Sequence, residues 1–368
     1  MNSNFKNINK IPVLTYRWLN VNDVSIYGYS LPQISEFNNQ IVDGVFQGNI
    51  EVINDKKMNL SQYDLDENLE FGVSKELVNL AENEKNILML IKTKKNEEVK
   101  DIIKIKYGFN EKNNTLVDYN IIDANENSKV TIILDYFSGD NSEGFHNGLT
   151  KIFARKNSIV DVVTIQRLNN KVYNFNSTVA NIEKDAKVNF INVELGGKYT
   201  VTNYKSNLVE DNSNADLSSI YVGDKDRTID INYLTVHNAK RTESKMTVKG
   251  VLKDTSKKTF RGTIDFKKGS SKSRGEEEEF VILLDKTVKS NAVPLLLCEE
   301  DDVIGSHAAS SGKIDENKLF YLMSRGFSEK EAKKLIIEAS FNPILDKIND
   351  EEIKASIRED IQRRLLND

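Results

Sequence analysis

The chain has 368 residues, of which 39% are hydrophobic and 29% are charged, as is ordinary for a soluble globular protein. Its formal net charge of −5 excludes the overall basic field that draws proteins to nucleic acid or acidic membranes. No apolar run reaches the roughly 18 residues of a membrane span. The single cysteine, Cys298, excludes an internal disulfide and a Cys-x-x-Cys motif.

The first residues, Met1 to Lys6, contain no apolar stretch of the length that a signal peptide needs. The use of only one cysteine also fits a reducing compartment. We therefore expect a cytoplasmic protein that binds neither nucleic acid nor a membrane.

Residues 1–85 are predicted to form a mixed N-terminal region of short extended pieces and one helix. The helix should run from Lys75 to Ala81, with Ser74 as its N-cap. Strands are expected near residues 87–92 and 102–107, where a larger β structure should begin. No function can be assigned to the first 85 residues from their sequence.

The middle of the chain carries a repeat of 29 residues. Each unit has a polar, small, polar pattern that leads into an apolar residue and then into a strand-like run. The apolar residues recur at a constant step, at Val130, Ile159, Val188, Leu217 and Met246. A second marker, Asn followed by an aromatic residue, keeps the same step at Asn174, Asn203 and Asn232. Two markers in one register indicate a structural repeat.

A period of this length is typical of a solenoid, a propeller or an array. The β-rich segments 130–134 and 188–193 exclude helical repeats, and the leucine-rich signature is missing. We predict a mainly β fold, a parallel β-helix over residues 86–312 with about 29 residues and two strands per coil. Each coil buries its apolar face only on its neighbours, so an open end of the solenoid needs a cap or a partner.

The repeat weakens after Met246. Residues 248–252 and 259–266 are interpreted as further strands, and an apolar strand is expected at 280–284. The polar stretch between them ends in the acidic run Glu276–Glu279, which is interpreted as a solvated loop.

Residues 313–368 are predicted to form a small C-terminal helical domain. A first helix should start after Asp315 and end at Gly326. Ser328 and Glu331 form a capping box for a second helix, which Pro343 should end. The apolar face of the second helix is expected at Ala332, Leu335, Ile336 and Ala339, and that of a third helix at Ile353, Ile357, Ile361 and Leu365.

The chain shows no catalytic constellation, so we do not expect an enzyme. Gly196-Gly197-Lys198 lacks the spacing of a phosphate-binding loop and is interpreted as a tight turn between coils. The three histidines have no His or Cys at ligand spacing, which disfavours a self-contained zinc site. We expect surface or coil-turn positions for His146 and His237, and a buried inert thiol for Cys298.

The stretch from Pro294 to Ile337 resembles the C-terminal signature of the SufB/SufD family of iron–sulfur cluster assembly scaffold proteins. The matching residues are Pro294, Asp301-Asp302-Val303, Ser306-His307-Ala308, Gly312-Lys313-Ile314-Asp315, Leu319-Phe320-Tyr321-Leu322, Ser324-Arg325-Gly326 and Glu331-Ala332. SufB-like chains carry a cysteine near the position of Glu279 and a glutamate at the position of Ala308, so the chain is more similar to the SufD branch. In the usual SufD-like signature a glycine follows the histidine, at the position where this chain has Ala308.

The resemblance implies a non-catalytic SufD-like scaffold subunit that pairs with a SufB-like subunit and docks a SufC-like ATPase. His307 would lie at the subunit interface, where it would either share a metal with the partner or stabilise the interface. A nascent iron–sulfur cluster would form there, and the chain alone would hold no stable cofactor. The isolated chain would be able to form a homodimer.

The same resemblance implies that the C-terminal helices dock the ATPase. The residues carried over for this role are Leu319, Phe320, Tyr321, Arg325 and Gly326. For Leu319 and Phe320 a place in the helical core is the alternative. Two other functions stay open, a β-helix enzyme that acts on polysaccharide and a SufB-like homodimeric scaffold.

Overall fold

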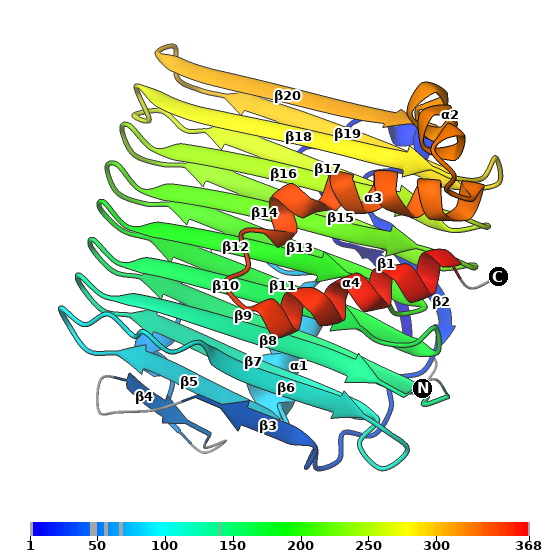
Figure 1. Cartoon of the computed structure of the whole chain (residues 1–368). Helices are drawn as coiled ribbons and strands as arrows, with labels where there is room; N and C mark the ends of the chain where they lie inside the picture. The colour runs from blue at the N-terminus through cyan, green and yellow to red at the C-terminus, as the bar shows by residue number, and fades with distance from the viewer. Residues whose placement is uncertain (1–2, 45–49, 55–57, 66–68, 140, 367–368) are drawn as a thin grey trace.

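The repeat folds into a two-sheeted β-solenoid that carries helices along one side (Figure 1). The computed structural model describes residues 3–44, 50–54, 58–65, 69–139 and 141–366. Each coil gives one strand to each of two nine-stranded sheets, called sheet I and sheet II below. The predicted mainly β fold with about 29 residues per coil is therefore confirmed.

Neighbouring strands are parallel, except that the short strands at the N-terminal end, β3 and β4, pair antiparallel with β6 and β5. Sheet I contains β3 (Gln40–Asp43), β6 (Ile103–Phe109), β8 (Lys129–Ser138), β10 (Ile159–Arg167), β12 (Lys187–Glu194), β14 (Asn214–Gly223), β16 (Glu243–Leu252), β18 (Ser273–Leu283) and β20 (Val303–Gly312). Sheet II contains β4 (Ile50–Ile53), β5 (Ile87–Thr93), β7 (Thr115–Ala124), β9 (Gly144–Ala154), β11 (Val172–Ile182), β13 (Tyr199–Leu208), β15 (Thr228–His237), β17 (Lys257–Phe266) and β19 (Lys289–Cys298).

The main hydrophobic core fills the lumen between the two sheets, where inward-facing residues of successive coils stack. The stacking register varies more than the constant step predicted from the sequence. The observed pairs are Val130–Val160, Phe190–Leu217 and Asn174–Thr200, against the predicted Val130–Ile159, Val188–Leu217 and Asn174–Asn203. The strands stay in register because turns of unequal length absorb the difference between coils.

The polar residues of the repeat form the turns that lead into sheet I. Asn127, Asn157 and Asp185 all have a positive φ, a conformation that Asn and Asp tolerate better than other side chains. Their side chains also connect successive coils, since Asn157 Nδ2 donates to Asn127 Oδ1 at 2.9 Å. Gly196 is required in the turn before β13, where a Cβ would lie 1.9 Å from the backbone oxygen of Leu168.

The N-terminal region packs on the outer face of sheet II. It consists of β1 (Ser3–Ile8), β2 (Val24–Tyr29), the 3-10 helices η1 (Arg17–Leu19) and η2 (Ser61–Tyr63), and α1 (Lys75–Glu84). Its apolar side chains form a second core with outward-facing residues of β5, β7 and β9. The predicted N-cap is confirmed, because Ser74 accepts a hydrogen bond from the Leu77 backbone N–H.

The C-terminal region contains α2 (Glu316–Ser324), α3 (Glu329–Leu345) and α4 (Glu351–Leu366). Helices α3 and α4 lie across sheet I (Figure 1) and share a core with its outward-facing residues. The caps at Asp315 and Ser328 and the buried face of Ile353, Ile357 and Ile361 are confirmed. No helix in the described part of the chain is both long and apolar enough to cross a bilayer.

Two predictions for α3 are wrong. The helix continues through Pro343 to Leu345, because proline at this position removes one backbone donor near the end of the helix without ending it. Its buried face also differs from the expected one. Ala332 is buried as predicted, but Leu335 and Ala339 are exposed, and the contact with sheet I is made by Ile337, Phe341 and Ile344.

Candidate functional site

The solenoid ends in an open coil that carries His307. Strands β19 and β20 are the last strands of their sheets, and no strand in the described part of the chain pairs with their outer edges. His307 lies in the middle of β20 with its side chain exposed. The C-terminal end of the solenoid therefore presents two unpaired edges with an imidazole on one of them.

The apolar lumen is also exposed at this end. On β19, the side chain of Leu296 is 39% exposed. It faces β20 across the lumen, since a Cβ on Gly305 would lie 2.8 Å from Leu296 Cδ1. In the coil before, the corresponding lumen residues Ile264 and Phe266 are fully buried. The last coil thus leaves its part of the core without a cover.

The acidic run beneath β20 is a strand, which corrects the prediction of a solvated loop. Residues 276–279 belong to β18, and their side chains alternate between the two faces of sheet I. Glu276 and Glu278 are exposed, whereas Glu277 and Glu279 point into the lumen and are buried. The period of two in a strand separates the four like charges into two environments.

Glu279 is held in a buried ion pair. Lys258 Nζ lies 2.7 and 2.9 Å from its two carboxylate oxygens, and the Tyr221 hydroxyl donates to it at 3.0 Å. Burial raises the pKa of Glu279 and lowers the pKa of Lys258, because each charged form loses water. The ion pair offsets part of that cost.

Glu277 lies directly beneath His307 and has no such partner. The two residues are paired in the parallel register of β18 and β20, so their side chains project to the same side. The Glu277 carboxyl reaches across the lumen to Gly262, where a Cβ would lie 2.5 Å from its Cδ. Burial, and then the charge of Glu279, raises the pKa of Glu277 to about 8.

The other two histidines are internal, which corrects the expected surface positions. His146 lies in the lumen with its ring nitrogens 2.7 Å from Asp118 Oδ1 and 2.5 Å from Asn174 Oδ1. His237 does end a strand at a coil turn, but it is buried between Thr242 and Ser244. Burial lowers its pKa to about 3.

Cys298 is exposed, so the prediction of a buried thiol is wrong. It ends β19 and pairs in register with Phe266 of β17. Because no further coil in the described residues follows this one, an inward-facing position on its outer side is not covered. Its Sγ donates to the backbone oxygen of Glu300 at 3.0 Å.

Helix α2, next to β20, presents an apolar face to solvent. Phe320 is 75% exposed and Tyr321 is 56% exposed, which excludes the core position considered for Phe320. Leu319 is partly buried against the core that the helices share with sheet I. The Arg325 guanidinium lies 5.3 Å from the centre of the Tyr321 ring, and Gly326 takes a positive φ after the helix ends.

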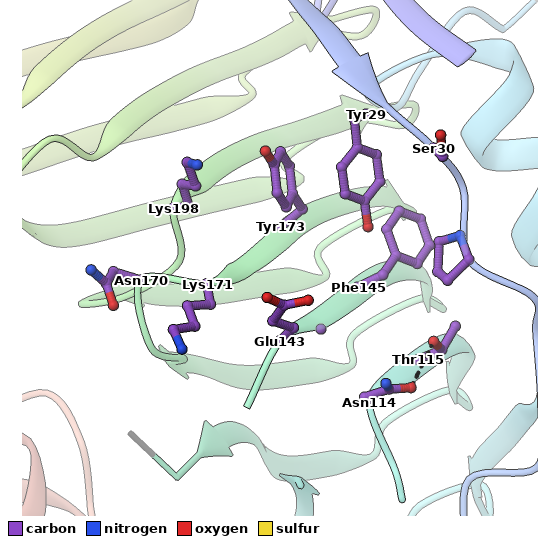
Figure 2. A pocket seen from close by; sticks show the side chains of 12 residues that line it. Tyr29, Ser30, Asn114, Thr115, Glu143, Phe145, Asn170, Lys171, Tyr173 and Lys198 are labelled. Atoms are coloured by element: carbon purple, nitrogen blue, oxygen red, sulfur yellow. Dashed lines mark hydrogen bonds between the residues drawn. The ribbon is translucent and has the colours of Figure 1, made fainter. Parts of the chain in front are cut away.

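A cavity of about 480 Å³ lies elsewhere, between the N-terminal region and the turns of sheet II. Figure 2 shows its lining, in which the rings of Tyr29 and Tyr173 face each other with centroids 4.0 Å apart. Glu143, Lys171 and Lys198 also line it. None of the predicted functional residues lies there.

The described residues contain no group of three His, Cys, Asp or Glu side chains that could hold a metal ion. His307 and the buried Glu277 are register partners at the open end, and the Glu277 carboxyl points to Gly262 rather than to His307. The sequence analysis missed Glu277. The signals that could have found it were the alternation of a strand through the acidic run and its place one coil before His307.

Comparisons with known proteins identify the family. The model described as SUF system FeS cluster assembly, SufBD core domain, matches residues 107–340. The iron–sulfur cluster assembly protein SufD of Bacillus subtilis is 28% identical over 273 residues, which cover 74% of this chain and 62% of that protein. A SufBD family protein of Mycobacterium tuberculosis is 29% identical over 203 residues, or 55% of this chain and 24% of the relative. The chain thus spans less than two thirds of the length of these relatives.

Proposed function

Because the chain belongs to the SufBD family of the SUF iron–sulfur cluster assembly system, we propose that it is a SufD-like scaffold subunit. In this proposal it pairs with a SufB-like subunit at the open end of the solenoid and docks a SufC-like ATPase through its C-terminal helices. The observation that carries the proposal is the uncovered last coil, with His307 exposed on its edge strand.

An edge strand with unpaired backbone groups is a template for another chain. Strands β19 and β20 are each 10 residues long, and the lumen residue Leu296 between them is partly exposed. A second solenoid that ends in the same way would pair with these edges and bury the exposed lumen of both chains. Such a partner would share this family's architecture, which supports a SufB-like subunit. Without that partner, a second copy of this chain would occupy the same edges.

His307 would then lie at the seam between the two subunits. A neutral imidazole there would act as a ligand to the nascent iron–sulfur cluster, which is the cargo of the system, or would hydrogen-bond across the interface. Most cluster ligands would come from the partner. This chain would thus act as a scaffold and would carry out no catalysis itself.

The exposed face of α2 supports the docking of an ATPase. Phe320 and Tyr321 are large apolar side chains in contact with solvent, and Arg325 lies beside them. An aromatic and arginine cluster of this kind is typical of interaction hot spots. Only residues 313–315 separate α2 from β20, so ATP-driven movement of the docked subunit would reach the seam through a short connection.

The proposal is tested by expressing the chain together with SufB-like and SufC-like subunits and purifying the complex. We expect all three chains to co-purify and to form a cluster when iron, sulfide and ATP are supplied without oxygen. His307→Ala should lower the cluster yield at least about tenfold and leave the complex intact. Phe320→Glu should release the ATPase but keep the SufB-like subunit.

The adjacent Ser306→Ala change serves as the control for His307, because side chains of neighbouring residues in a strand point to opposite faces. An unchanged cluster yield in His307→Ala would reduce His307 to a structural role. A chain that captures neither partner would contradict the scaffold function as a whole.

A further inference from the structure

The N-terminal region carries a short loop whose large apolar side chains lie in solvent. Residues 13–19, between β1 and β2, are called the Trp18 loop below. Five of its seven side chains are apolar or aromatic and 49–78% exposed: Val13, Leu14, Tyr16, Trp18 and Leu19. Single exposed apolar residues are ordinary in soluble proteins, whereas a contiguous group of them marks an interaction surface.

The Trp18 loop holds its shape through its own backbone. Tyr16 and Asn20, which flank the 3-10 helix η1, have left-handed backbones with φ of 47° and 52°. Asparagine tolerates this conformation, but a tyrosine in it is strained. Thr15 N–H donates to Asn22 Oδ1 at 3.0 Å, and the rings of Tyr16 and Trp18 pack edge to face with centroids 6.2 Å apart. A loop that is already ordered loses little conformational entropy when it binds.

The base of the loop lies on the outer face of sheet II, next to its last strand. Asn232 on β15 donates to the backbone oxygen of Lys10 at 2.7 Å, and Arg261 on β17 donates to that of Val21 at 2.6 Å. Val293 on β19 is the register partner of Arg261, so its side chain points to the same outer face. Val293 is 2% exposed although β19 is an edge strand in the described residues. The N-terminal region, blue in Figure 1, packs on this face, so its cover over Val293 places the loop beside the unpaired edge of β19.

We propose that the Trp18 loop is a second part of the pairing surface and contacts the subunit that adds to the edge of β19. Strands lie about 4.8 Å apart in a sheet, so an added strand would lie about 10 Å beyond β17. The loop closes where Ile11 N–H donates to Asn22 O at 3.1 Å. About four residues on each side of its tip span up to roughly 13 Å, which is enough to reach that strand.

The occupant of the loop is the SufB-like subunit, an assignment that rests on the proposed function. The ATPase is proposed at α2, which follows β20 of sheet I, whereas the loop lies on sheet II. Tryptophan, tyrosine and arginine are the residues most enriched in interaction hot spots, and the exposed Arg17 lies between Tyr16 and Trp18. The partner should therefore present an apolar recess for the Trp18 ring and a carboxylate for Arg17.

The first test uses Trp18 as a reporter, because it is the only tryptophan in the sequence. The chain labelled with 5-fluorotryptophan should give one ¹⁹F NMR resonance, whose position depends on whether the solvent is H₂O or D₂O. An unlabelled SufB-like subunit should move the resonance and remove this solvent dependence. A SufC-like ATPase alone, or phosphatidylglycerol vesicles, should change neither. Leu296→Lys, which places a charge in the open lumen, should abolish the effect of the SufB-like subunit.

The second test is capture of the SufB-like subunit by Trp18→Ser. Binding should weaken at least about tenfold, as for a hot-spot residue, while the melting temperature stays that of the wild type. Tyr27→Ser is the matched control and should leave capture unchanged, because Tyr27 is 69% exposed on β2, outside the Trp18 loop.

The outcomes separate the role of the loop from the scaffold function. Equal capture by Trp18→Ser and the wild type would overturn the inference and leave the scaffold function standing. The same holds if the SufB-like subunit binds without moving the ¹⁹F resonance, or if the ATPase or the vesicles move it instead. A wild-type chain that captures no SufB-like subunit would contradict both.

Discussion

Single residues in the lumen show how the solenoid accommodates polar groups that it cannot expose. His146 lies between Asp118 and Asn174, and Asn192 donates to Glu194 at 2.8 Å. A buried polar group that has a hydrogen-bond partner lowers the stability of the fold little. A buried polar group without a partner lowers it by the full free energy of its lost hydration. Glu277 departs from this rule, and it does so at the one end of the lumen where the core is not covered.

His237 leads to a prediction about acid stability. Burial lowers its pKa from 6.5 to about 3, so below pH 6.5 the unfolded chain binds a proton that the folded chain does not. Stability should therefore fall as the pH drops from 6.5 towards 3, by about 2 kcal/mol at roughly pH 5. Thermal melting of wild type and His237→Gln should show a smaller loss in the variant over this range.

His307→Gln is the matched control for this measurement, because it removes a histidine whose side chain is exposed. Its melting temperature should follow that of the wild type from neutral pH to about pH 5. Equal acid sensitivity in His237→Gln and the wild type would contradict the assignment of His237 as a buried neutral residue.

At the scale of elements, the unpaired strands and the exposed helix lie at the same end of the molecule (Figure 1). The backbone edge of β20 is unpaired in the described residues, Leu296 on β19 is partly exposed, and Phe320 on α2 is exposed. Helices α3 and α4 bury their apolar faces on sheet I instead. Among the three C-terminal helices, α2 has no buried residue, which sets it apart as the one available to a partner.

Leu296→Lys tests the role of the open lumen in pairing. A charged side chain there should oppose the stacking of a second solenoid, because an ammonium group would have to lose its water. Capture of the SufB-like subunit should fall at least about tenfold while the chain keeps its melting temperature. Val209→Lys is the matched control, since Val209 is also 39% exposed but lies in a turn within the middle coils. Equal capture by both variants would show that pairing uses another surface.

The sequence predicted the elements far better than the environments of single residues. The repeat and the caps at Ser74, Asp315 and Ser328 are local signals, and the structure confirms them. The observed stacking register differs from the constant 29-residue step because it depends on the lengths of the turns between coils. The two repeated sequence markers do not show these turn lengths. The exposure of Cys298 was missed because it depends on whether another coil follows, which the residue itself does not show. The burial of Glu277 was missed because the acidic run was interpreted as a loop, although it alternates as a strand.

At the scale of the whole molecule, the N-terminal region ties distant coils together. Arg261 forms two hydrogen bonds to the Asp230 carboxylate, at 2.6 and 2.9 Å, and donates to the backbone oxygen of Val21 at 2.6 Å. Asn9 bonds to Asp230 and to the Thr202 backbone oxygen. Solenoid coils otherwise contact only their neighbours, so these bonds add long-range cooperativity.

Arg261→Met should weaken this connection. Removing one partner of a buried ion pair leaves Asp230 without its counter-charge, at a cost of about 3 kcal/mol or more. Trypsin should then cleave the N-terminal region at Lys10 or Arg17 at least several times faster than in the wild type. Arg274→Met, which changes an exposed arginine, is the control and should leave the cleavage rate unchanged. Equal cleavage rates for all three chains would show that the region is held by other contacts.

The two ends of the rod differ in a way that limits how many rods can join. At the N-terminal end, β3 and β4 are each four residues long and pair antiparallel with their neighbours. Their short edges provide few backbone hydrogen-bonding groups for pairing with a second chain. Among the described residues, the long unpaired parallel edges are those of β19 and β20 at the other end. Two such rods can meet end to end, and the pair then has no further end to extend from. With the proposed pairing at this end, the fold favours a closed pair over a growing fibre, and the contact includes the edge strand that carries His307.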